Sequence, residues 1–318
     1  MIKLKSKICF AILIIATFAI LSPVNTHALQ NENLGREITD SEYENLRKLG
    51  LNEETIKNLD IETFEKYKDF EIGEQAITTK YFKDVPIRTL SIVDQYKYIP
   101  VEVTEEEYKN SEPNLERAAS HETTYKKLTL TITRHPNSMN TSRIVVADLT
   151  WKQLPANKSY DVFALYATSG VFEMPTAYQH KEELAPSGDT CSLNTTKTWT
   201  TTYSSYHPDW NTTGVLSVYK GAGISMQLDT RRTPCTYDLG VVLGFDKGYN
   251  FQMITSATPG ENNSVTIRAS YQHAQGTVSL SASKNYQFST AGYGGVILFN
   301  NSSTASIYDR MGGVSDTL

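Results

Sequence analysis

Residues 128–167 read LTLTITRHPNSMNTSRIVVADLTWKQLPANKSYDVFALYA, and this stretch decides the fold. In it, three segments of alternating apolar and polar residues are separated by breaks at 135–138 and 154–157. A period of two is typical of β-strands, because successive side chains point to opposite faces of a sheet. The breaks contain proline and asparagine, which favour turns. The stretch therefore predicts three consecutive strands that open an all-β domain.

The second and third of these segments predict where the core lies. The third, 160–167, is apolar on both faces, which is typical of a central strand that is covered on both sides. The turn around Pro155 is expected to bring Trp151 and Asp161 onto neighbouring strands. The core face of the second segment is expected to carry Val145, Ala147, Leu149 and Trp151.

The rest of the chain continues the β pattern. A glycine-rich run at 292–295 reads as a turn or bulge. About ten short strands with no helical period between them predict a mainly β fold, an antiparallel β-sandwich, over residues 119–318. After the opening stretch, strand-like segments follow at 215–219, 224–228, 239–245, 251–254, 265–271, 278–282 and 296–299.

Residues 29–118 differ from the rest of the chain in net charge and in predicted secondary structure. They hold 21 Asp and Glu against 12 Lys and Arg, a net charge of −9, whereas residues 119–318 hold 14 against 15, a net of +1. Thr39 with Glu42 forms a capping box, Gly50 stands where a helix would end, and Asn52 and Asp60 can cap two further helices. Such short helices are unstable alone, so they must pack on each other or on the β domain, as a cap or as an interaction module.

The end of this front segment has mixed signals. Segments 77–82 and 98–103 could be strands, and Pro86 and Pro100 point to sheet edges. Residues 104–120 are charged and show no apolar stripe, so we interpret them as a linker. The domain boundary is expected near Ala119.

The first 28 residues predict a signal peptide. Lys3, Lys5 and Lys7 precede an apolar run at 8–21, and small residues end the segment at Ala28. An uncleaved anchor is the alternative, but no basic stop-transfer flank follows the run. No later segment is apolar enough to span a bilayer. We therefore expect a secreted, extracellular bacterial protein without a stable membrane span once the signal is removed.

Two cysteines, Cys191 and Cys235, follow the signal segment. In an exported chain such a pair predicts one disulfide, worth on the order of 4 kcal/mol in the chain-entropy model. The alternative is a nucleophilic Cys191, but its neighbours lack the context of a cysteine protease.

Several short motifs carry a resemblance. They are Leu149-Thr150-Trp151 followed by 159–162, the front pattern at 45–56, and the tail at 292–296 with Tyr308-Asp309. Over most of the mature chain these motifs resemble exported proteins of Gram-positive spore-formers, which combine a short helical front segment with a β-rich C-terminal domain. The resemblance implies secretion and a shared architecture. That group has no described activity, so it supplies no catalytic residues.

Motifs for chemistry are scarce. The sequence has no basic stripe for nucleic acid, no metal-ligand spacing, no phosphate-binding glycine loop and no nucleophile elbow, so we expect no metal or cofactor. Asp161 alternates with apolar residues and must be hydrogen-bonded or paired, for example with loop amides or with an arginine such as Arg143; a catalytic carboxylate is the alternative. A secreted hydrolase would need Asp161, His207 and Asp209 to converge.

One segment is rich in rings among polar residues. Exposed aromatics beside polar donors suit sugar stacking or a protein interface, although the same rings could instead point into the core. The candidate ligand-binding residues are Trp199, Tyr203, Tyr206, His207 and Trp210.

Three functions remain open from the sequence. The first is a non-enzymatic exported β-sandwich that binds a surface glycan or protein through this aromatic segment. The second is the secreted hydrolase. The third is a membrane-active or pore-forming protein that uses an amphipathic hairpin over residues 264–283.

Overall fold

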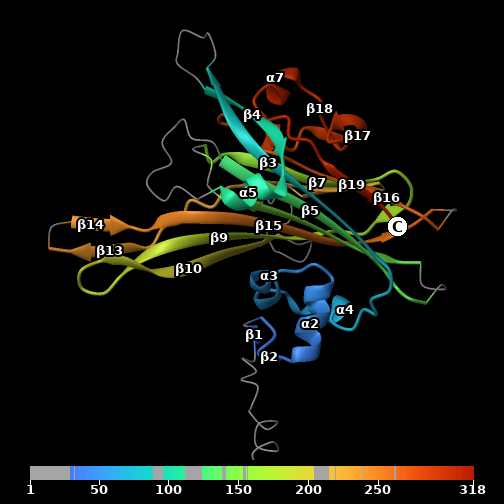
Figure 1. Ribbon diagram of the computed structural model, residues 1–318, viewed down its shortest axis with the longest axis horizontal. Coiled ribbons are helices and arrows are strands. Elements are labelled where there is room, and N and C mark those ends of the chain that lie inside the picture. Colours follow the sequence, from blue (N-terminus) through green and yellow to red (C-terminus); the bar gives the residue numbers. More distant parts are fainter. Residues whose placement is uncertain are drawn as a thin grey trace, which may run out of the picture.

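The computed structural model describes residues 29–31, 33–88, 96–111, 124–137, 141–152, 155, 157–203, 215–218, 220–238, 240–260 and 263–318. Within them, the protein is mainly β and antiparallel (Figure 1). Two sheets pack face to face through one large apolar core, which confirms the predicted sandwich class.

The larger sheet has the strand order β10-β9-β15-β6-β5-β3-β4, and the short strand β8 pairs with β15. Its members are β3 (Gln75–Arg88), β4 (Tyr96–Val103), β5 (Thr124–Arg134), β6 (Arg143–Trp151), β8 (Val171–Phe172), β9 (Thr176–Ser187), β10 (Ser192–Tyr203) and β15 (Phe245–Thr258).

The smaller sheet has the order β11-β12-β7-β16-β19. Its members are β7 (Tyr160–Ala167), β11 (Val215–Val218), β12 (Gly221–Gln227), β16 (Thr266–Gln272) and β19 (Val314–Thr317). Three hairpins stand outside both sheets: β1 (Leu29–Asn31) with β2 (Arg36–Ile38), β13 (Pro234–Tyr237) with β14 (Gly240–Leu243), and β17 (Tyr286–Tyr293) with β18 (Ile297–Phe299).

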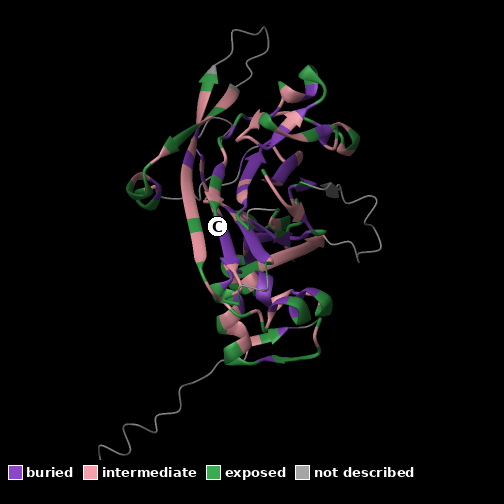
Figure 2. Cartoon of the chain, turned by 90° about the vertical axis from the view of Figure 1, so that its right-hand side faces the viewer, coloured by how far each residue is buried: buried purple, intermediate pink, exposed green. Residues whose placement is uncertain are grey.

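The opening stretch forms β5, β6 and β7 as predicted. The expected core face of β6 points between the sheets, where Val145, Ala147, Leu149 and Trp151 are buried. β7 lies between β12 and β16 and is buried on both sides, with Phe163 toward the large sheet and Val162 toward the β17–β18 hairpin. Figure 2 shows that buried residues gather on strands in the middle of the molecule.

The three predicted front helices are present as α2 (Asp40–Lys48), α3 (Glu53–Lys57) and α4 (Ile61–Tyr67). Thr39 and Glu42 form the capping box, and Asn52 and Asp60 cap the other two helices. Gly50 has φ +102°, which a side-chain-bearing residue rarely adopts. In Figure 1 these helices lie below the large sheet. They pack on its outer face against Ile144, Val146, Tyr178 and Ile254.

One expectation for the front region needs correction. Part of the expected linker is a helix, α5 (Glu105–Asn110): the Thr104 hydroxyl accepts a hydrogen bond from the Glu107 amide at 3.1 Å, and Tyr108 is buried. The strands expected at 77–82 and 98–103 are present as parts of β3 and β4. They pair into the large sheet beside β5, with β4 at its edge, although they precede the expected boundary. The boundary at Ala119 itself lies outside the described residues and stays a prediction.

Two expectations for the β region are also wrong. Residues 278–282 do not form a strand; Ser279 caps the short helix α6 (Leu280–Ser283), so the amphipathic hairpin over 264–283 is not formed. β16 instead pairs with β7 and β19 inside the smaller sheet. Trp151 and Asp161 lie on facing sheets rather than on neighbouring strands, because β6 and β7 belong to different sheets.

His180 on β9 joins the helical segment to the sheet. Its Nε2 lies 2.8 Å from the Thr55 hydroxyl of α3, and its Nδ1 lies 3.0 Å from the Thr200 hydroxyl of β10. Burial lowers the pKa of His180 to about 3, because the buried site disfavours the charged imidazolium.

This burial predicts acid sensitivity. Between about pH 6.5 and pH 3 the unfolded chain binds a proton at His180 that the folded chain does not, so stability falls as the pH falls. Between pH 6.5 and about pH 4, His180 is expected to lower the unfolding free energy of the wild type by about 3 kcal/mol. His180→Gln should abolish this part of the fall, as measured by urea denaturation at each pH. A pH dependence of His180→Gln identical to that of the wild type would contradict this assignment.

Candidate functional site: a disulfide-stapled finger

One end of the large sheet extends into a projection that we call the finger. It consists of the outer ends of β9, β10 and β15 together with the β13–β14 hairpin, which projects furthest (Figure 1). β15 pairs with β9 from Phe245 opposite Leu184. The hairpin therefore continues the sheet beyond its last regular strand pair.

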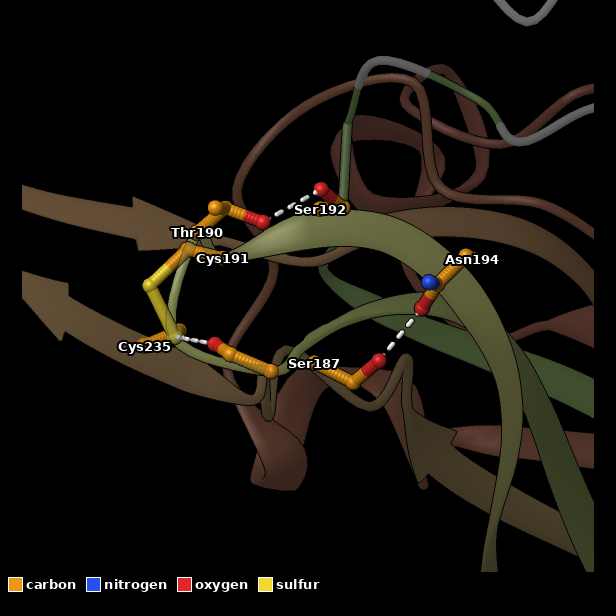
Figure 3. Close-up of a disulfide and its surroundings, with 7 residues drawn as sticks. Ser187, Thr190, Cys191, Ser192, Asn194 and Cys235 are labelled. Atoms are coloured by element: carbon orange, nitrogen blue, oxygen red, sulfur yellow. Dashed lines mark hydrogen bonds between the residues drawn. A yellow bond between two sulfur atoms is a disulfide. The ribbon is translucent and has the colours of Figure 1, made fainter.

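The predicted disulfide Cys191–Cys235 staples the finger (Figure 3). The two Cα atoms are 5.6 Å apart, and the bond joins the β9–β10 turn to strand β13. Cys191 has φ +51°, within the tight turn that begins at Gly188. Two segments separated by 44 residues are thereby held together at the end of the finger.

The β13–β14 hairpin has an exposed apolar surface. Among the described residues ten large apolar side chains are exposed, and four of them lie within residues 237–245. Val241, Leu243 and Phe245 are spaced two apart, so an extended chain places them on one face. We call these three residues the apolar tip; Tyr237 pairs with Gly240 and lies on the other face of the hairpin.

Trp199 lies at the base of the finger and is not a free aromatic platform. Its indole N–H donates to Glu183 Oε2 at 2.8 Å, and the charged ends of Lys197 and Arg231 lie 3.9 and 4.9 Å from its ring centroid. Burial alone would raise the pKa of Glu183, but hydrogen bonds from Trp199 and Thr233 hold it below its ordinary value. Trp199 thus ties β10 to β9 and to the chain leading into β13.

The other candidate binding residues divide into two groups. Tyr203 packs against the large core, and burial raises its pKa. Tyr206, His207 and Trp210 lie outside the described residues, as does Asp209. The structure therefore places Trp199 and Tyr203 in structural contacts, and the aromatic patch as a whole stays a prediction.

A second ionic cluster anchors the start of β15. Asp246 Oδ1 lies 2.7 Å from Lys181 Nζ, and its other oxygen contacts Lys158 and Arg232. Burial alone would raise the pKa of Asp246, but hydrogen bonds from Lys158 and Lys181 lower it. No sequence pattern pointed to this cluster, because its four residues come from distant segments.

The centre of the sandwich contains a buried ionic network. Lys126 Nζ lies 2.6 Å from Asp309 Oδ2 and 2.9 Å from Asp84 Oδ1. Asp161 accepts hydrogen bonds from the Tyr271 hydroxyl and from the Ala274 amide at 2.9 Å. Its carboxylate also lies 3.0 Å from His273 Nδ1.

This network is structural rather than catalytic. Lys126, Asp84, Asp161, His273 and Asp309 are each less than 5 % exposed, so no substrate in solvent reaches them. Burial raises the pKa of Asp309 despite the nearby Lys126. Burial alone would lower the pKa of His273, but the charge of Asp161 raises it. Asp161 is thus a hydrogen-bond acceptor, as expected.

Of the two expected kinds of partner for Asp161, a backbone amide is present, that of Ala274, but the arginine is not. Arg143 donates to the carbonyl oxygens of Thr141 and Asn263 instead, at 2.6 and 2.9 Å. The actual partners come from β16 and the residues directly after it, in the same sheet as Asp161.

A row of paired residues connects this network to the finger. At directly opposed positions on successive strands stand Trp199, Lys181, Tyr249, Trp151, Lys126 and Phe82. Opposed residues in a sheet point to the same face. Lys126 Nζ lies 4.5 Å from the Trp151 ring centroid, a favourable cation–π distance. The row therefore runs from the buried centre to the base of the finger.

Comparisons with known proteins add little. No protein-family model and no curated protein matches this chain. Among 44 solved chains that match, one is titled a pore forming protein: it is 12% identical, with a TM-score of 0.18, over 48% of this chain and 75% of that one. A likeness this distant supports neither a fold assignment nor a function.

The described residues contain no group of three or more His, Cys, Asp or Glu that could hold a metal ion. They also contain no helix long and apolar enough to cross a membrane.

The buried network predicts a large effect for Lys126→Ala, because the change leaves Asp84 and Asp309 buried without their cation. We expect a loss of about 3–5 kcal/mol in unfolding free energy by urea denaturation. The control Lys80→Ala breaks the half-exposed pair with Glu102 (2.9 Å) and should cost at most about 1 kcal/mol. Equal losses in the two variants would be inconsistent with the network described.

Proposed function

We propose that this chain is an exported, non-enzymatic protein that binds the interface of a lipid bilayer through the apolar tip of its finger. The observation that carries the proposal is the exposure of Val241 (60%) and Leu243 (48%) on β14 and of Phe245 (44%) at the start of β15, at the projecting end of the finger. Exposed apolar side chains gathered in one place mark interaction sites. The disulfide is of the kind that persists in oxidising compartments, which supports export.

Pairing across the hairpin reduces the backbone cost of contact with the interfacial layer of a membrane. Pro234 pairs with Leu243, Cys235 with Val242, and Thr236 with Val241. Amides and carbonyls that hydrogen-bond to each other across the hairpin need no water partners in a poorly hydrated environment. An unpaired loop of the same composition would not have this property.

Charge distinguishes the apolar tip from other exposed apolar surface. Asp238, at the turn, is the one charged residue among residues 233–245. A second exposed apolar group lies on β3 and β4, but Lys97 stands opposite Ile87 and Lys83 opposite Val101. A charge is costly in hydrocarbon, so the apolar tip is the better membrane contact. Asp238 would keep this contact at the interface and prevent deep insertion.

The finger also holds its tip in a fixed position. The disulfide closes its outer end, and Glu183 fixes the chain that enters β13 by accepting from the Thr233 amide at 2.7 Å and from the Thr233 hydroxyl at 2.9 Å. A preorganised contact surface loses less conformational entropy on binding.

The proposal predicts that apolar side chains at the tip are needed for binding. We expect Val241→Ser with Leu243→Ser to weaken co-sedimentation with phosphatidylcholine vesicles by about tenfold or more, because apolar area leaves water on binding. The matched control, Ile99→Ser with Val101→Ser on β4, also replaces two exposed apolar residues spaced two apart and should bind normally. Unchanged binding by the tip variant, or no vesicle binding by the wild type, would refute the proposal.

The disulfide provides a second test. Replacing both Cys191 and Cys235 by serine should lower the unfolding free energy by roughly 4 kcal/mol, because a long loop is no longer closed in the unfolded chain. The same variant should bind vesicles more weakly at a temperature where it remains folded, since the hairpin is less constrained. Full binding without the disulfide would mean that the staple serves stability alone.

A further inference from the structure

We propose that a cleft on the outer face of the large sheet binds a neutral, polyhydroxylated small molecule of the size of a monosaccharide. This outer cleft has a volume of about 330 Å³ and lies between α3 and strands β6, β9, β10 and β15. Its lining includes Glu54, Thr150, Glu182, Thr196, Thr198 and Gly248. The site is separate from the apolar tip and does not depend on membrane binding.

A β-bulge opens the floor of the outer cleft. On β15, Asp246 pairs with Glu183 but Gly248 pairs with Glu182, so Lys247 is an extra residue. A Cβ at Gly248 would have one neighbour within 4 Å, the carbonyl oxygen of Trp151 at 3.2 Å. The space above Gly248 is therefore open to a ligand.

The polar groups of the outer cleft suit hydroxyl groups. Thr196 and Thr198 are spaced two apart on β10, so both hydroxyls face the cleft, where each can donate and accept. Glu54 and Glu182 add carboxylate oxygens, which accept several hydrogen bonds each. A ligand hydroxyl can donate to a carboxylate and accept from a threonine at the same time.

Each carboxylate that lines the outer cleft is paired with a lysine. Glu54 lies 3.0 Å from Lys57, which also contacts Glu53 at 2.6 Å, and Glu182 lies 2.6 Å from Lys247. Each carboxylate therefore already has a cation, and the cleft attracts neither anions nor cations strongly. A neutral ligand that makes many hydrogen bonds fits these groups better than a charged ligand does.

His180 forms a fixed wall of the outer cleft. Both of its ring nitrogens contact protein hydroxyls, Thr55 and Thr200, so it holds α3 against the sheet rather than meeting the ligand with a free nitrogen. The side chains of Trp151 and Tyr249 are buried in the core between the sheets, so neither can stack on a sugar in the cleft. Binding without an aromatic platform should be weak, in the millimolar range.

The outer cleft and Trp199 lie on opposite faces of the same strand. Trp199 belongs to the row that faces the core, whereas its neighbour Thr198 lines the outer cleft. The aromatic residues of this region suggested a saccharide site. The threonines of the outer cleft are therefore a better location for such a site than the indole ring of Trp199.

Saturation-transfer NMR on the whole mature chain with D-glucose, D-mannose and N-acetyl-D-glucosamine tests the site. We expect saturable binding of at least one sugar, lost in Gly248→Val, which fills the floor, and about tenfold weaker in Thr198→Val, which removes one hydroxyl. Thr202→Val, on the same strand and the same face but outside the cleft, should bind normally. Thermal unfolding establishes that each variant is folded.

A panel of immobilised glycans distinguishes two sources of the same chemistry. Binding of a free sugar without retention on glycans supports a free monosaccharide as the ligand. Retention on an immobilised glycan supports the end of a surface glycan as the ligand, provided that the free sugar and the Thr198→Val substitution each reduce this retention. The inference is overturned if no sugar binds by either route, or if Gly248→Val and Thr198→Val bind like the wild type.

Discussion

The sandwich depends on the buried ion pairs that Lys126 makes with two aspartates. The ammonium group of Lys126 lies between Asp84 of β3 and Asp309 near the C-terminus, so it joins the front strands, the centre of the large sheet and the end of the chain. A buried ammonium is tolerated only with opposite charges at close range. Residues brought together from positions 84, 126 and 309 can satisfy this requirement only in the complete fold.

Paired side chains connect this centre to the finger. The row from Lys126 through Trp151, Tyr249 and Lys181 reaches Trp199, where Glu183 fixes the chain entering the β13–β14 hairpin. Buried polar residues of β9 thus serve to hold the finger, and the disulfide fixes its outer end. The apolar tip is exposed on a scaffold that is constrained from its base to its end.

Local patterns in the sequence predicted β5, β6, β7, the front helices and the disulfide, because alternation, caps and cysteine pairing are local or compositional signals. They missed β9, whose buried face carries Lys181 and Glu183, since charged residues read as exposed until their partners are known. They also missed α5, because its cap at Thr104 lies in a charged run. The apolar tip was read as part of a strand at 239–245; only the tertiary fold shows that its side chains are exposed.

The central claim is that the apolar tip contacts a lipid surface, and hydrogen–deuterium exchange of the wild-type protein with and without phosphatidylcholine vesicles tests it most directly. We predict that vesicles slow amide exchange in residues 234–245 and leave the β3–β4 ribbon unchanged. Slowed exchange on β3–β4 with an unaffected hairpin, or no change anywhere at saturating lipid, would contradict the claim.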